Sequence, residues 1–335
     1  MRKPFPIRIL AVLLLSCLVA PSTASAQDLG EIAWWLWDYF SSPSKKLDPD
    51  YVFQPRNGFS VSSDYTLARH TASIYSEEES FPKLKTEPRV INNVGFSFGY
   101  GPLSLGFSHE IGRKSRVSKD YSLRWFTNSY SIDARYDRYF SGISAGDAKI
   151  KSILLGGLYA FNQERFSYRA AFSGGVVQRR SAGSVVAAAK FSRGDISLDT
   201  RNEALMDIMM GTGGFSSRQL SAGIGYSYNW VPFHEDAVSK RDLRGLRNLT
   251  VNLTAVPMLA IRNRLVTTDI ESKSTKTRGH VRPSFTARAG ICYSTGHFYL
   301  TSWADFSQFE FNDGSLQHKG SFSSLLTEFQ LNYRF

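Results

Sequence analysis

Apolar and polar residues alternate with a period of two along most of the chain, from Phe59 to the C-terminal Phe335. The alternation is clearest in the segments 218–231 and 247–262, where aliphatic and aromatic residues are separated mainly by serine, threonine, asparagine and glutamine. Successive side chains of a β-strand point to opposite faces, so this period gives each strand one apolar and one polar face. The pattern predicts an all-β protein.

The alternation divides the chain into about twelve predicted strands. Most are longer than the ~5–6 residues usual in soluble sheets, and they match the ~9–11 residues of a membrane-spanning strand. A soluble sandwich would turn the apolar face inward, whereas a transmembrane barrel turns it outward to lipid. The predicted strands are 59–67, 93–100, 103–108, 123–138, 149–161, 165–179, 182–193, 218–231, 247–262, 280–294, 296–309 and 321–335.

Strand ends and connections favour the barrel. Aromatic residues gather near strand ends, where the interfacial girdles of a barrel lie. Short links at 101–102 and 294–297 alternate roughly with long ones, the longest at 194–217. Two links depart from this alternation, a tight one at 162–164 and a long one at 232–246. Because unpaired strand edges are excluded from hydrocarbon, we predict a closed, transmembrane antiparallel up-and-down β-barrel of about 12 strands.

The two ends of the chain indicate export to the outer membrane. Residues 1–26 have a basic start, an apolar stretch and a small-residue cleavage site at 24–26, which predicts a cleaved signal peptide. In a rival interpretation, Cys17 is lipidated. The last strand alternates and stops on Phe335, the pattern by which outer-membrane barrels are passed to their assembly machinery. We expect this machinery and outer-membrane lipid as partners.

Between the signal peptide and the barrel, residues 27–57 form a separate predicted region. Apolar residues at 32, 35, 36 and 39 share one helical face, so we expect a short amphipathic helix over 29–40, preceded by capping-box spacing at 28 and 31. Its tryptophans suit either a membrane interface or packing on the rest of the protein. Residues 41–57 read as a linker, and the predicted barrel occupies 58–335.

Composition excludes several classes of function. The formal net charge is +11, but the basic residues are scattered without a Lys/Arg-rich run, so we expect no nucleic-acid partner. The sequence has no glycine-rich phosphate loop, paired-cysteine metal site or His-Glu-x-x-His motif, and its six histidines lack ligand spacing. We therefore expect no cofactor, no metal site and no enzymatic activity.

Charged residues on the polar faces of the strands would line the lumen if the apolar faces contact lipid. They would either form a selective path for passive solute passage, or pair with one another and brace the barrel. A barrel of ~8 strands is filled by side chains and one of ~16–18 strands is a wide channel, so about twelve strands leave both readings open. The candidate lumen charges are Asp64, Asp133, Arg135, Asp137, Arg169, Arg282, Arg288, Glu328 and Arg334.

The alternative function is a lipid-modifying acyl hydrolase acting at the membrane interface. Ser108 and His109 lie at the predicted outer end of one strand, and His70 with Ser73 at the end of another. Adjacent strand residues point to opposite faces, so Ser108 and His109 cannot act together as nucleophile and base. A cross-strand pair of His70 and Ser108 stays open, as does a structural or surface-interaction role without chemistry.

Three segments in the middle of the chain carry a resemblance to a known family: Tyr159-Ala160-Phe161-Asn162, then 166–172 (FSYRAAF), then 178–184 (QRRSAGS). With Asp48-Pro49-Asp50-Tyr51 and the strand from Phe59, they resemble a Bacteroidota-type outer-membrane β-barrel family known as a domain of unknown function. The resemblance covers about residues 45–335. It implies the barrel and its location, and it implies no activity.

Overall fold

The computed structural model describes the part of the chain that follows the predicted signal peptide and helix, with several gaps. The described residues are 47–55, 59–76, 84–85, 89–111, 118–127, 129–143, 146–199, 201, 203, 212–269, 274–279, 281–312 and 318–335. The predicted signal peptide and the predicted helix at 29–40 lie outside this range. The described residues belong to the compact unit Pro43–Phe335.

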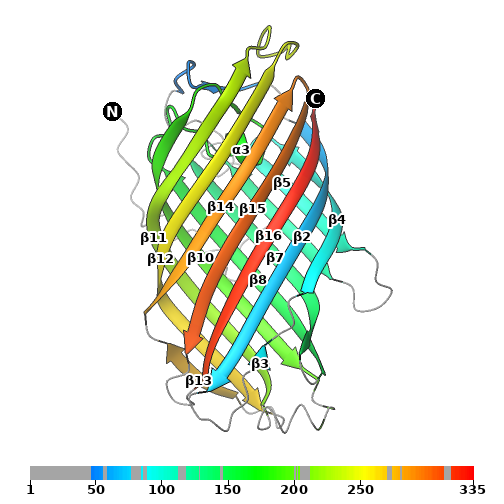
Figure 1. Ribbon diagram of the computed structural model, residues 1–335, viewed down its shortest axis with the longest axis vertical. Coiled ribbons are helices and arrows are strands. Elements are labelled where there is room, and N and C mark those ends of the chain that lie inside the picture. Colours follow the sequence, from blue (N-terminus) through cyan, green and yellow to red (C-terminus); the bar gives the residue numbers. More distant parts are fainter. Residues whose placement is uncertain are drawn as a thin grey trace, which may run out of the picture. The chain divides into compact units, whose positions relative to one another are not determined.

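Twelve long antiparallel strands form one closed barrel, as predicted. Each strand pairs with the next along the ring, and the last pairs with the first through the register Phe329↔Tyr65, so no edge is left open (Figure 1). The strands are β2 (Phe59–Ser76), β4 (Arg89–Tyr100), β5 (Leu103–Glu110), β6 (Lys119–Phe126), β7 (Tyr130–Ile143), β8 (Gly146–Ala160), β10 (Ala182–Leu198), β11 (Thr212–Glu235), β12 (Arg247–Asp269), β14 (Arg282–Thr295), β15 (Phe298–Asn312) and β16 (His318–Arg334).

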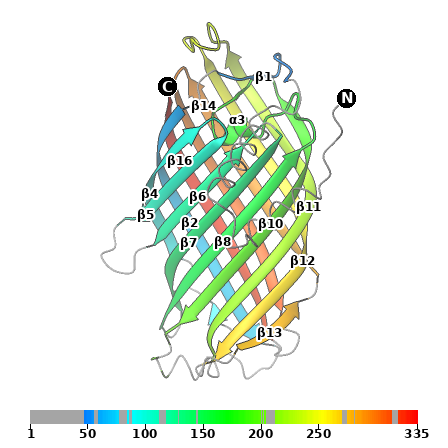
Figure 2. The ribbon, with the colours of Figure 1, turned by 180° about the vertical axis from the view of Figure 1, so that it is seen from behind.

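In the described part of the chain, five short elements accompany the barrel. They are β1 (Val52–Phe53), β3 (Leu84–Lys85), β9 (Val177–Gln178), β13 (Ser274–Gly279) and α3 (Arg169–Phe172). β3 pairs with β2 and β13 with β12, and both extend the barrel sheet at the end away from the C-terminus. β1 and β9 form a separate two-stranded sheet, which lies with α3 at the end where the C-terminus lies (Figure 2). Among the described residues, no helix is long and apolar enough to cross a membrane.

Two of the predicted strands are wrong, and their errors cancel in the count. The segment 123–138 contains two strands, because Thr127 and Tyr130 close a turn in which the Tyr130 amide donates to Thr127 Oγ1 at 3.0 Å. The segment 165–179 is no barrel strand: it contains α3 and β9 inside the long link 161–181. The tight link predicted at 162–164 is therefore wrong, and the links 161–181 and 236–246 both lie at the C-terminal end of the barrel.

The two faces of the wall have opposite chemistry. On the outer face, Ile224 and Leu253 keep 66% and 63% of their surface exposed. On the inner face, Ser227, Asn229 and Thr250 are fully buried. A water-soluble sheet buries its apolar face, whereas a membrane barrel presents that face to lipid. The protein is therefore a transmembrane barrel with a polar lumen.

Candidate functional site

The link 161–181, called the plug below, fills the lumen at the C-terminal end. Phe166, Tyr168 and Phe172 are buried within it, and the rings of Tyr168 and Phe172 lie 4.7 Å apart. The barrel wall makes room for the plug at Gly290, where an added Cβ would lie 2.5 Å from the Phe172 ring. Burial of three aromatic side chains gives the plug an apolar core that is continuous with the barrel interior.

Wall side chains also hold the plug by its backbone. Arg334 Nη1 donates to the carbonyl of Gly174 at 2.9 Å, and Asn229 Nδ2 donates to the carbonyl of Ser167 at 2.8 Å. Asn248 Nδ2 donates to the carbonyl of Gln178 at 2.8 Å. Buried backbone carbonyls must be hydrogen-bonded, so three strands supply partners that the plug, which has little regular structure, cannot supply itself.

Two plug side chains, Arg169 and Tyr168, add to this packing. Arg169 donates to the carbonyl of Gly101 in the turn between β4 and β5. Burial lowers the pKa of Arg169 to about 10 and raises the pKa of the Tyr168 hydroxyl to about 12. At neutral pH Arg169 is therefore charged, which is the form that donates to the carbonyl. Tyr168 is neutral, which is the form that packs in an apolar core.

Residues 47–55 cover the plug from its other side. Val52 and Phe53 pair with Gln178 and Val177 in the β1–β9 sheet. Arg165 Nε contacts Asp48 Oδ2 at 3.2 Å. The segments whose sequence resembles the family, 48–51, 159–162, 166–172 and 178–184, therefore meet in the plug and its surroundings.

On the side of the plug that faces the opposite end of the barrel, ion pairs lie within the lumen. Arg124 of β6 binds both carboxylate oxygens of Glu328 on β16, at 2.9 and 2.6 Å. Arg135 of β7 contacts Asp120 of β6 and, at 3.0 Å, Asp137 on its own strand. All five side chains are nearly buried. Such pairs are strong when complete, and costly when one partner is removed.

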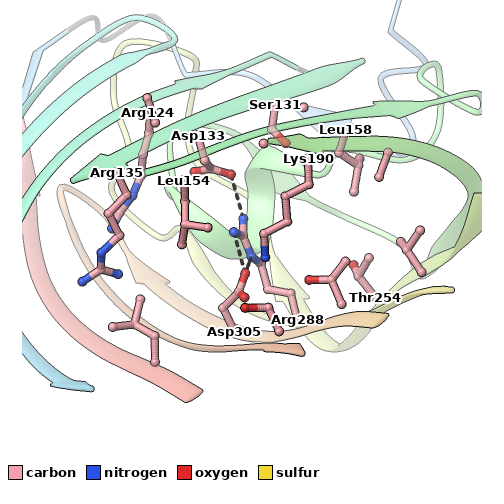
Figure 3. A pocket seen from close by; sticks show the side chains of 18 of the residues that line it. Arg124, Ser131, Asp133, Arg135, Leu154, Leu158, Lys190, Thr254, Arg288 and Asp305 are labelled. Carbon is pink, nitrogen blue, oxygen red and sulfur yellow. Dashed lines mark hydrogen bonds and ion pairs between the residues drawn. The ribbon is translucent and has the colours of Figure 1, made fainter. Parts of the chain in front are cut away.

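A second group of charges is centred on Arg288 of β14 (Figure 3). Its guanidinium lies 3.1 Å from Asp133 and 2.8 Å from Asp305, and it therefore joins β7 to β15 across the barrel. It also lies over the rings of Phe172 and Trp303, at 5.5 and 5.4 Å from their centroids. Because Phe172 belongs to the plug, Arg288 connects the ion pairs to the plug.

A cavity of about 130 Å³ lies beside this group. Arg288, Asp133, Asp305 and Lys190 line one part, and Leu154, Leu158, Val256 and Met258 are among the apolar residues that line the rest. Its size is close to that of the engineered apolar cavity of ~150 Å³ that binds benzene. The cavity is therefore of small-molecule size.

The predicted lumen charges are distributed over these groups. Asp133, Arg135, Asp137, Arg288 and Glu328 take part in the ion pairs, and Asp64 is buried in the lumen with no ion pair among the described residues. Arg169 and Arg334 hold the plug. Arg282 stands apart, at the first position of β14.

Four important lumen residues were not predicted: Arg124, Asp120, Asp305 and Lys190. Arg124 lies outside the prediction because the sequence pattern makes 123–138 one strand, in which Arg124 faces outward. Inward residues are even-numbered in β6, such as Arg124, and odd-numbered in β7, such as Asp133, so the turn at 127–129 reverses the register. The polar run at 127–129 was the available signal, since such residues favour turns.

The residues considered for lipid hydrolysis do not come together. Across β4, Ser108 of β5 is level with Asp64 of β2. His70 lies six residues farther along β2, which corresponds to about 20 Å at ~3.3 Å per residue. His70 is buried and stacks on Tyr139 with ring centroids 4.4 Å apart. His109 is exposed on the outer face. The side chain of Ser73 lies outside the described part of the structure.

The chain is weakly similar to several solved structures. The outer membrane protease OmpT from Escherichia coli is 10% identical with a TM-score of 0.36, over 84% of this chain and 98% of that chain. The translocator domain of the autotransporter NalP from Neisseria meningitidis is 10% identical with a TM-score of 0.33, over 92% and 98%. The toluene transporter TodX from P. putida is 6% identical with a TM-score of 0.24, over 83% and 90%.

Curated proteins offer no match to this sequence. The family model of the domain of unknown function DUF4421 matches residues 46–335, which include the whole barrel, the plug and the segment that covers it. The chain therefore belongs to the DUF4421 family.

Proposed function

We propose that the protein is an outer-membrane barrel closed to free solute passage, with a structural or surface-interaction role. The observation that carries this proposal is the plug, which fills the C-terminal end of the lumen with buried aromatic side chains and is held by donors from β11, β12 and β16. A plug held this way resists displacement, because each broken contact leaves a buried carbonyl unpaired.

The ion pairs support the same role. In a selective channel, charged groups face a water-filled path and are free to meet a passing solute. Here Arg124 and Arg288 bind carboxylates across the lumen, and Arg135 binds a carboxylate of the neighbouring strand. Their charges are used within the protein, so they brace the barrel against deformation instead of offering a path.

Delivery to the outer membrane rests on the chain's two ends. The proposal takes residues 1–26 as a signal peptide and Phe335 as the contact with the barrel-assembly machinery. Phe335 follows β16 on the outer face, where its ring lies 5.3 Å from Phe59 and 4.9 Å from Tyr333. An aromatic C-terminal residue exposed beside the closing strand pair suits recognition by another protein.

The proposal assigns no lipid hydrolase activity to the barrel. A scissile lipid ester lies outside the wall, whereas His70 lies inside it and about 20 Å along the strand direction from the level of Ser108. A nucleophile and its base need to be within hydrogen-bond reach of each other.

Single-channel conductance in a planar bilayer tests the closed state. We expect the wild-type barrel to show no steady steps, and a variant with a Gly-Ser replacement of residues 165–177 to show them. A replacement of equal design at 237–242, in the other long link at the same end, is the matched control and should stay silent. Steady ohmic steps from the folded wild-type barrel would contradict the closed lumen.

A further inference from the structure

Two rows of cationic side chains lie on neighbouring strands, near the barrel end that is remote from the C-terminus. In the first row, Lys119 of β6 is directly opposite Arg138 of β7, which is directly opposite Lys151 of β8. In the second row, Arg193 of β10, Arg218 of β11 and Arg264 of β12 are neighbours in the same way. The register therefore places six cations in two sets of three.

Both rows face outward. Asp120, Asp137 and Ser152 are buried in the lumen, so their chain neighbours Lys119, Arg138 and Lys151 point away from it. The same alternation applies to the second row, whose neighbours Ser192, Gln219 and Asn263 are buried. These charges therefore take no part in the ion pairs of the lumen.

Like charges placed directly opposite one another on a sheet are destabilising. Among the described outward residues of these strands, the carboxylate close to the rows is Asp195, which contacts Arg193 at 2.9 Å and is opposite Lys151. Lys119, Arg218 and Arg264 form no ion pair within the described part of the chain. The two rows thus have an excess of positive charge, which an external anion would neutralise.

Three cations at the other end of the barrel each have a carboxylate partner. Arg244 pairs with Asp242 at 2.6 Å, Arg179 with Asp236 at 2.6 Å, and Arg247 with Glu235 at 3.8 Å. Three cations at that end are therefore neutralised within the protein, whereas Lys119, Arg218 and Arg264 of the two rows have no such partner in the described part of the chain.

The surface beside the first row is apolar. Next to it, on the side toward the C-terminal end, lie Tyr121, Tyr136 and Ile153, followed by Leu123 and its neighbours Ala134 and Leu155. The rings of Tyr121 and Tyr136 lie 6.2 Å apart. A molecule that matches both surfaces has an anionic head and long apolar chains.

We propose that the two rows bind the phosphate groups of an anionic membrane lipid, whose acyl chains lie along the apolar surface beside the first row. Arginine binds phosphate through paired N–H donors, and lysine adds a compact charge. Three cations on successive strands allow one head group to contact several of them. This lipid belongs to the leaflet at the end opposite the plug.

Native mass spectrometry of the folded, full barrel in detergent tests the proposal. The ligand is a lipid A bearing two phosphates, and the comparison ligand is the same lipid with both phosphates removed. The variants K119Q/K151Q and R218Q/R264Q each remove two cations from one row and leave the Arg193–Asp195 pair intact. The control K240Q/R241Q removes two exposed cations from the link 236–246 at the other end.

We expect each row variant to weaken binding of the phosphorylated lipid about fivefold per cation removed, and the control to leave it unchanged. The substitutions are on the outer surface, so we expect both row variants to fold. A heat-modifiable band in gel electrophoresis identifies the folded barrel. One folded variant, from either row, is enough for the test. Equal binding of the dephosphorylated lipid, an equal loss in the control, or displacement by an equal concentration of inorganic phosphate would overturn the proposal.

Discussion

The two halves of the lumen are closed by different physical means. In the C-terminal half, the plug combines buried aromatic side chains with hydrogen bonds to its backbone carbonyls. In the other half, Arg124, Arg135 and Arg288 form ion pairs across the wall, and a cavity of about 130 Å³ remains beside them. The first half holds only a smaller cavity of about 50 Å³, lined in part by Arg169 and Phe172, so it is the more tightly packed of the two.

This difference predicts which substitutions each half of the lumen can tolerate. A tightly packed interior resists both loss and gain of volume, since side chains there have little free space. A braced interior depends on matched charges, and it accepts added volume where the cavity lies. Changes of size should therefore act on the plug half, and changes of charge on the ion-pair half.

The largest expected effect is removal of the central plug ring. We expect Phe172→Ala to lower the free energy of unfolding by about 3–5 kcal/mol, because a buried ring is replaced by a cavity. Phe161→Ala is the matched control, since Phe161 is an exposed phenylalanine at the start of the plug, and it should cost less than about 1 kcal/mol. Urea unfolding of the folded barrel measures both. Equal effects would contradict a packed plug.

Breaking the Arg124–Glu328 pair should destabilise the barrel by a similar amount, and removing both charges together should restore most of the stability. We expect Arg124→Met alone to destabilise the barrel by about 3–5 kcal/mol, because Glu328 is left as an unpaired buried charge. The double variant R124M/E328L should regain most of the loss, since the charge is gone. The same unfolding assay gives the double-mutant cycle. Additive losses would show that the two residues do not act as a pair.

The stability cost of replacing a glycine with alanine distinguishes the plug half from the ion-pair half most directly. We expect Gly290→Ala to cost about 1–3 kcal/mol, because the new Cβ would lie 2.5 Å from Phe172. The change in unfolding midpoint measures this cost. G290A combined with F172A should cost less than the sum of the two single changes, because the clash is then removed; simple additivity would contradict the contact.

The smallest expected effect is at Gly156, on the inner face of β8 beside the cavity. An added Cβ there meets no atom within 4 Å. We expect Gly156→Ala to leave stability unchanged or to raise it by about 0.4–1 kcal/mol, through reduced freedom of the unfolded chain. A loss comparable to that of G290A would show that the ion-pair half is packed like the plug.

Period-two alternation sufficed to predict the barrel and the apolar outer face of most strands, because lipid on one side and polar groups on the other impose that pattern. The predicted strand number is right only because the two strand errors cancel. It could not distinguish the plug from a strand. Phe166, Tyr168 and Phe172 sit at even spacing in sequence, yet they are buried in the lumen and do not face lipid. Which of two apolar environments a segment enters depends on contacts with distant strands.

The candidate site was only partly predictable for a related reason. Inward charges follow from strand register, so one missed turn at 127–129 put Arg124 on the wrong face. Asp305 lies within the correctly predicted segment 296–309, but it shares the inner face with Trp303, which hides the polar pattern. Ion-pair partners such as Arg288 and Asp133 are 155 positions apart, and no local pattern joins them.

Cys292 offers the most direct test of the closed lumen. Its side chain is buried on the inner face of β14, two residues from Gly290, which contacts the plug. With Cys17→Ser it is the only thiol, and its modification by a charged, membrane-impermeant thiol reagent can be followed in the folded barrel. We predict that Cys292 stays protected until the whole barrel unfolds, and that replacing residues 165–177 exposes it without unfolding. Rapid modification in the folded wild-type barrel would contradict the account, because it would show that the plug leaves the lumen.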